Sequence, residues 1–150
     1  MNSENIMRNL SFEILKPHHD TSTFQSKHEE LNSYLKNDAL KAQESYDKVT
    51  HLVIYEEEII GYFSLHVYFE GIPTNDYEQL KEDIPELPER NRLPLVEIEK
   101  FTMSEKYEIP EVIMSVYDNI VHNIKNIFSE YDFDGVSIAI SNNCGIPMEN

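Results

Sequence analysis

The stretch of sequence that decides the fold is residues 95–113, which read LVEIEKFTM and then SEKYEIPEVI. The first nine residues alternate between apolar and polar side chains, as a strand with one buried face does. Their apolar positions change parity, because Val96 and Ile98 are even-numbered whereas Phe101 and Met103 are odd-numbered. A strand that keeps both pairs on one face must slip by one residue between them, as a β-bulge does. We therefore predict a bulged strand.

A long helix is predicted after the bulged strand, and a further strand after the helix. Pro110 suits the first turn of a helix, and apolar residues recur at spacings of three or four from Ile113 to Phe128. Residues 136–140 read VSIAI and form a short strand. A strand–helix–strand unit within one sheet implies a parallel pair with a right-handed crossover.

Upstream of this unit, the sequence predicts a strand, a helix and a hairpin. Residues 11–15 form the strand, and the helix opens with a capping box made by Ser26 and Glu29. The hairpin has arms at 51–55 and 59–69, and the glutamates between them leave the turn type open because they contain no Asn-Gly pair. The fold class is therefore α/β or α+β, a mixed sheet in the order strand–helix–hairpin–strand–helix–strand.

Composition limits the classes of function that fit this chain. Its 150 residues carry 28 acidic and 12 basic side chains, a net charge of −16, and 40% are hydrophobic. This fits a single domain over 1–150, with 141–150 as an irregular tail. The charge argues against direct binding of nucleic acid or an anionic membrane. The lack of a signal pattern and of a long apolar run favours a cytoplasmic location.

The acidic residues are concentrated in two stretches, 70–89 and 105–111. Such stretches favour a protein partner with a basic surface, including a surface that otherwise binds nucleic acid, because carboxylates can imitate phosphates. The residues predicted to contact this partner are Glu78, Glu82, Asp83, Glu86, Glu105, Glu108 and Glu111.

The element order and three pieces of sequence together resemble the GNAT superfamily of acetyl-CoA-dependent N-acetyltransferases, in particular its toxin-type branch. The pieces are FQSKHEELNSYL at 24–35, THLVIYEEEIIGYFSL at 50–65 and the strand at 95–103. The resemblance covers residues 12–140 and implies a GNAT-like mixed sheet. The chain ends where the family continues with another helix, so we expect a C-terminally shortened domain without the tyrosine that protonates the leaving thiolate.

The resemblance also implies where acetyl-CoA would bind. The bulged strand would offer backbone groups to the acetyl-CoA arm, and the loop after it would wrap the pyrophosphate at a helix N-terminus. The positions that carry over to this chain are Phe101, Thr102, Met103, Lys106 and Tyr107.

The phosphate loop departs from the family pattern, which is Gln/Arg-x-x-Gly-x-Gly/Ala. The glycine positions hold Ile109, Glu111 and Ile113, and the Gln/Arg position holds Glu108. Glycines let a backbone approach phosphate closely, Pro110 lacks an N–H donor, and carboxylates repel the anion. These changes favour a protein without a cofactor, and acetyl-CoA remains the cofactor of the alternative interpretation.

Glu99 is the candidate general base, because some GNAT enzymes hold such a carboxylate on this strand. The competing interpretation, which the period-two pattern favours, is that Glu97 and Glu99 simply face solvent. Two functions stay open. The favoured one is a GNAT-derived protein that binds a protein partner, and the alternative is an active N-acetyltransferase that acts on an amine.

Two further expectations concern oligomerisation and metals. The strand at 136–140 would leave an apolar sheet edge uncovered, so we predict a homodimer or a partner that adds a strand there. The grouping of His18, His19 and Asp20, even with His28, matches no zinc spacing, so no metal site is predicted.

Overall fold

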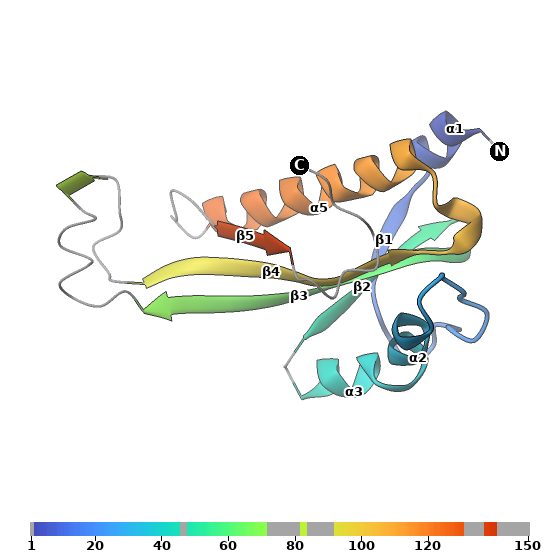
Figure 1. Ribbon diagram of the computed structural model, residues 1–150, viewed down its shortest axis with the longest axis horizontal. Coiled ribbons are helices and arrows are strands. Elements are labelled where there is room, and N and C mark those ends of the chain that lie inside the picture. Colours follow the sequence, from blue (N-terminus) through green and yellow to red (C-terminus); the bar gives the residue numbers. More distant parts are fainter. Residues whose placement is uncertain (1, 46–47, 72–81, 84–91, 131–136, 141–150) are drawn as a thin grey trace.

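The computed structural model describes residues 2–45, 48–71, 82–83, 92–130 and 137–140. Its elements, in chain order, are α1 (Ser3–Arg8), β1 (Ser11–Ile14), α2 (Glu29–Asn37), α3 (Ala39–Glu44), β2 (Val49–Tyr55), β3 (Glu58–Gly71), β4 (Arg92–Met103), the 3-10 helix η1 (Glu105–Tyr107), α5 (Pro110–Glu130) and β5 (Ser137–Ile140). The strands form one five-stranded sheet in the order β1-β2-β3-β4-β5 (Figure 1). Among the described strand pairs, β4–β5 is parallel and the other three are antiparallel, which confirms the predicted mixed sheet.

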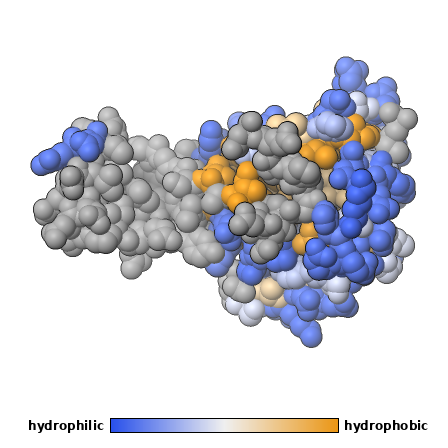
Figure 2. Space-filling view, viewed as in Figure 1, coloured by the Kyte–Doolittle hydropathy of each residue, from blue (hydrophilic) through white to orange (hydrophobic). Residues whose placement is uncertain are grey.

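Helices cover both faces of this sheet. Helices α1 and α5 lie on one face, and α2 and α3 lie on the other (Figure 1). Each face has its own hydrophobic cluster, one built around Phe101 and Ile120, the other around Leu35 and Tyr62. In Figure 2 the described surface is mostly hydrophilic and is interrupted by hydrophobic atoms, including a group where Figure 1 places β5. No helix within the described residues is long and apolar enough to cross a bilayer.

The predicted β-bulge lies in β4. Ser64 pairs with Lys100 and the next residue, Leu65, pairs with Ile98, so Glu99 is the extra residue. This slip confirms the parity prediction, because it puts the two even-numbered and the two odd-numbered apolar residues on the same face, the one covered by α5. The four residues, each at most 2% exposed, are Val96, Ile98, Phe101 and Met103.

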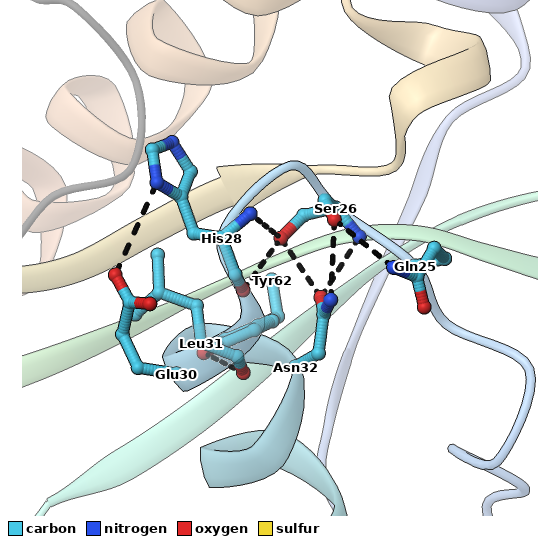
Figure 3. Close-up of polar contacts among 7 residues, drawn as sticks. All are labelled: Gln25, Ser26, His28, Glu30, Leu31, Asn32 and Tyr62. Atoms are coloured by element: carbon cyan, nitrogen blue, oxygen red, sulfur yellow. Dashed lines mark hydrogen bonds and ion pairs between the residues drawn. The ribbon is translucent and has the colours of Figure 1, made fainter.

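The predicted capping box is wrong. Helix α2 begins at Glu29, and its N-cap residue His28 makes no side-chain cap bond. Ser26 instead bonds to Asn32, whose Oδ1 accepts from both the Ser26 N–H and the Ser26 hydroxyl at 2.8 Å (Figure 3). Asn32 Nδ2 donates back to the Ser26 carbonyl at 3.1 Å. The hydroxyl is therefore used to close the loop before the helix.

Two further features differ from the predictions. The single helix expected after residue 26 is two helices, since α2 ends at Asn37 and α3 begins at Ala39, with Asp38 between them. Helix α1 was not predicted, because six residues are too few to show a period. It is held by the Asn2 side chain, which accepts from two N–H groups of its first turn, and by Ile6, which is fully buried.

Several sequence predictions lie outside the described residues. These are Glu78, Glu86, most of the acidic stretch 70–89, and the tail 141–150.

The turn between β2 and β3 has an unfavourable sequence for its backbone. Glu56 and Glu57 have φ values of 49° and 65°, the left-handed region that two-residue hairpin turns require. This region costs non-glycine residues about 1–2 kcal/mol each.

We expect the substitution of Glu56 by Asn and Glu57 by Gly to raise the free energy of unfolding by about 1 kcal/mol, after the entropic cost of glycine is subtracted. Urea denaturation measures this change. The matched control changes both residues to Gln, which removes the same two charges and keeps the strained backbone. Equal changes in the free energy of unfolding for the two double variants would contradict the explanation that the backbone of Glu56 and Glu57 is strained.

Candidate functional site

The residues proposed for the acetyl-CoA arm lie at the C-terminal end of β4. Phe101, Thr102 and Met103 are buried, and each pairs with a residue of β3. Within the described residues, β5 pairs with β4 only at 95–98, which leaves the edge of β4 at 100–103 without a neighbouring strand on that side. Any contact with a ligand there would use the backbone, because these three side chains are enclosed by the protein.

The loop that follows β4 uses most of its backbone donors internally. Four N–H groups within residues 104–109 donate to backbone carbonyls at distances of 2.8–3.0 Å: Ser104 to Ile60, Glu105 to Gln25, Tyr107 to Ser104 and Ile109 to Tyr107. Pro110, the first residue of α5, has no N–H. The segment therefore has few amides to offer an anion at this helix N-terminus.

The side chains of this loop also interact within the protein. Lys106 Nζ lies 3.0 Å from Glu58 Oε1, and Lys27 Nζ lies 3.1 Å from Glu108 Oε2. The hydrogen bond to Glu58 raises the pKa of Lys106 above its usual value. Both lysine side chains are about two-thirds exposed, so each pair adds little stability.

Two of the positions where the family has glycine carry core side chains. Ile109 and Ile113 are partly buried and pack against the cluster formed by α5 and β4. Tyr107 is buried beside them and its ring meets that of Tyr55 edge-on, with centroids 6.0 Å apart. The loop is thus packed as part of the core.

Glu99 is buried, at 6% exposed, so the prediction that it faces solvent is wrong. Ile98 and Phe101 both face α5, and the bulge therefore puts Glu99 and Lys100 together on the opposite face. Lys48 Nζ lies 2.9 Å from Glu99 Oε2, and Lys100 Nζ bonds to Glu99 Oε1.

These lysines fix the charge of Glu99. Burial by itself would raise the pKa of this carboxyl, but hydrogen bonds from Lys100 and Lys48, together with their charges, outweigh burial and lower it. Lys100 also lies over the ring of Tyr34, 4.1 Å from its centroid. A general base must accept a proton, whereas Glu99 is held as an anion by two ammonium groups.

Among the residues that the structure describes, two side-chain clusters have the composition of metal ligands. The ligand atoms of Glu13, His18 and His19 lie within 4.8 Å of one another, and so do those of a second cluster, His66, Glu97 and Glu99. In the first, His19 Nδ1 accepts from the Lys16 N–H at 2.9 Å, so Nε2 carries the proton that faces Glu13. In the second, both oxygens of Glu99 already meet lysines.

The predicted partner-binding residues fall into three groups. Glu82, Asp83, Glu105 and Glu111 are exposed. Glu108 is half-buried and paired, and the remaining two lie outside the described residues.

An acidic pocket of about 750 Å³, which the sequence did not predict, lies between β1, the β1–α2 loop and the β2–β3 turn. The three consecutive glutamates of the turn were the available signal. Its acidic lining residues are Glu13, Asp20, Glu56, Glu57 and Glu58.

A mixed sheet whose bulged strand leads into a long helix is the GNAT-type fold, and comparison with solved structures supports this class. The chain is similar to AtaT complexed with acetyl-methionyl-tRNAfMet, with a TM-score of 0.66 and 14% identity over 87% of this chain and 77% of that one. It is also similar to a mutant AtaT toxin bound to the C-terminus of the antitoxin AtaR and acetyl-CoA, with a TM-score of 0.64 and 12% identity over 87% and 74% of the two chains.

A mutant of KacT gives a TM-score of 0.59 at 14% identity, over 85% of this chain and 74% of that one. No protein-family model and no curated protein sequence matches this chain. At these identities, the likeness shows a GNAT toxin-type fold.

Proposed function

We propose that this GNAT-fold protein does not carry out ordinary acetyl-CoA chemistry and acts by binding a protein partner through acidic surfaces. The observation that carries the proposal is the loop after β4. Four of its amides are bound to carbonyls of the chain, and Pro110 supplies none. Ile109 and Ile113 pack into the core where the family has glycines.

Charge supports the same conclusion. Glu108 and Glu111 flank the start of α5, where the family receives a pyrophosphate. One carboxylate about 4 Å from a phosphate charge costs about 4 kcal/mol at an effective dielectric of 20. At a helix N-terminus with no ligand, the same carboxylates are favourable.

The exposed carboxylates support a basic protein as the partner. Glu82, Asp83, Glu105 and Glu111 are exposed on a chain of net charge −16. Acidic surfaces of this kind steer a cationic partner and hold it by screened attraction. The mutant AtaT toxin of similar fold has been solved bound to the C-terminus of its antitoxin, so the fold accommodates a protein partner.

The edge of β5 is a second place for protein contact. β5 is the last strand of the described sheet, and Ile140 is 37% exposed. We propose that a strand of the partner, or of a second copy of the chain, pairs there.

An active N-acetyltransferase is the second candidate, and one observation favours it. The edge of β4 at 100–103 has no neighbouring strand within the described residues, next to the bulge at Glu99. Backbone groups there could hold the arm of acetyl-CoA, as the resemblance implies. In this interpretation Glu99, the candidate base for an amine, would first have to be released from its ion pairs with Lys48 and Lys100.

The partner proposal is tested by capturing a protein from a lysate of the source cells on the immobilised full chain. We expect retention to fall at least about tenfold between 0.15 M and 1 M salt, because the Debye length shrinks from about 8 Å to about 3 Å. Neutralising Glu82, Asp83 and Glu105 should weaken capture at low salt. A partner retained unchanged in molar salt would show that charge does not bind it.

A further inference from the structure

We propose that the groove between α1 and the outer face of α5 docks a basic amphipathic helix of the partner. This inference rests on the proposed function in one respect, namely that a protein partner exists. It adds the surface and the chemistry of the segment that binds.

The groove is built on a single stripe of α5. It has a volume of about 560 Å³, and Met7 of α1 forms its other wall. Its lining residues on α5 recur at helical spacing and are Glu111, Met114, Ser115, Asp118, Asn119 and His122. Eleven residue steps of an α-helix span about 16 Å, which is three turns of a docked helix.

Met7 packs partly against the core, whereas Met114, the apolar residue that α5 gives to the groove, is not needed by it. Val112, Val116 and Ile120 are at most 1% exposed, and they fix the buried face of α5. Met114 lies on the other face and is 51% exposed, an unusual position for a large hydrophobic side chain in this molecule. Methionine adapts its flexible thioether to varied apolar partners. Met114 is therefore a suitable anchor for an apolar side chain.

The charge of the groove selects the partner. Glu111 and Asp118 are both exposed and stand two turns apart, with Met114 between them. Among the residues that the structure describes, neither Lys nor Arg lines the groove. A helix lying alongside with cations seven residues apart would place them about 10 Å apart, which matches the separation of these carboxylates along α5.

Polar side chains of the α5 stripe make hydrogen bonds within α5 and do not pair with Glu111 or Asp118. Asn119 Nδ2 donates to the Ser115 carbonyl at 2.8 Å, and Asn126 Nδ2 lies 3.1 Å from His122 Nε2, so these contacts stay within α5. A second copy of the chain is a poor occupant of this particular groove, because each of its described α-helices carries only one Lys or Arg and so cannot face both carboxylates.

The test uses a fluorescent amphipathic peptide of about 18 Leu and Lys residues, long enough for five helical turns, and a scrambled peptide of the same composition. Anisotropy titrations measure the binding of the peptide to three variants of the full chain. Two carry changes in the groove: the single variant Met114→Ser, and a double variant that combines Glu111→Gln and Asp118→Asn. The third is a matched control, a double variant that combines Glu29→Gln and Glu44→Gln outside the groove. We expect each groove variant to weaken binding by about tenfold or more, and the control by less than about twofold.

Several results would overturn the inference. They are equal binding by all the variants, equal binding of the scrambled peptide, or a wild-type dimer in sedimentation that Met114→Ser dissociates. Circular dichroism verifies that each variant is folded, as expected for exposed positions.

The lysate experiment separates this inference from the proposed function. In one outcome, capture responds to salt and to neutralisation of Glu82, Asp83 and Glu105, but not to the groove variants. In that case the partner proposal stands, and the proposal that the partner docks in the groove is wrong. If capture responds to none of these changes, the partner proposal itself fails.

Discussion

Glu99→Gln is expected to lower the free energy of unfolding by about 3 kcal/mol, because removing one partner of a buried ion pair strands the other charges. Here two ammonium groups lose this carboxylate, those of Lys48 and Lys100, whose side chains are 25% and 14% exposed. Glutamine fills the same volume, so the loss reports charge and hydrogen bonding rather than a cavity. Urea denaturation at neutral pH measures it.

The loss depends on pH in a defined direction. The pKa of Glu99 is lowered in the folded protein from its ordinary value of 4.5. A carboxyl of this kind contributes stability above its unfolded pKa, and this contribution disappears as the pH falls through the folded pKa. The difference between wild type and Glu99→Gln should therefore be full at pH 7 and shrink below about pH 4.5.

The exposed Glu105 provides the matched control for this substitution. Glu105→Gln removes the same charge and should change the free energy of unfolding by less than about 0.5 kcal/mol. A difference between Glu99→Gln and wild type that stays constant from pH 7 to about pH 3 would contradict the assigned ion pairs.

Asn32→Ala is expected to cost about 3 kcal/mol, the second large effect. Asn32 is fully buried and makes three hydrogen bonds to Ser26. Alanine would leave the Ser26 N–H without its acceptor, which costs about 1–3 kcal/mol, and would open a cavity beside it. Thermal and urea unfolding both measure the loss.

Asn37 is a matched control in the same helix. Its side chain is exposed and donates at 3.2 Å to Ser33 Oγ. Asn37→Ala should change stability by less than about 0.5 kcal/mol. If the two alanine variants unfolded alike, the buried network of Ser26 and Asn32 would not hold the loop.

The sequence predicted most of the sheet, because the decisive signals were local. The parity change between Ile98 and Phe101 located the bulge, since burial of both residues requires it. Pro110 marked the start of α5 for an equally local reason, its fixed φ and missing N–H.

The features that the sequence did not predict depend on contacts between distant segments. Ser26 could cap a helix or close a loop, and the choice depends on where Asn32 lies in the fold. Glu99 reads as a solvent-facing position until the bulge and the approach of Lys48 from the start of β2 are known.

The candidate site shows the same division. The sequence indicated that the phosphate loop departs from the family pattern, through Glu108, Pro110 and Glu111. The sequence did not indicate that the backbone amides of this loop are hydrogen-bonded within the protein, because one of them donates to Gln25, far away along the chain. The packing of Ile109 against the core was equally hidden.

Acetyl-CoA titration of the full chain tests the central claim most directly. Calorimetry and thermal unfolding with acetyl-CoA up to about 1 mM should show no binding heat and no rise in stability, because the loop offers few amides and two carboxylates. AtaT, solved with acetyl-CoA bound, serves as the positive control. A dissociation constant of about 1 μM, which at a hundredfold excess would stabilise the protein by about 2.7 kcal/mol, would contradict the claim.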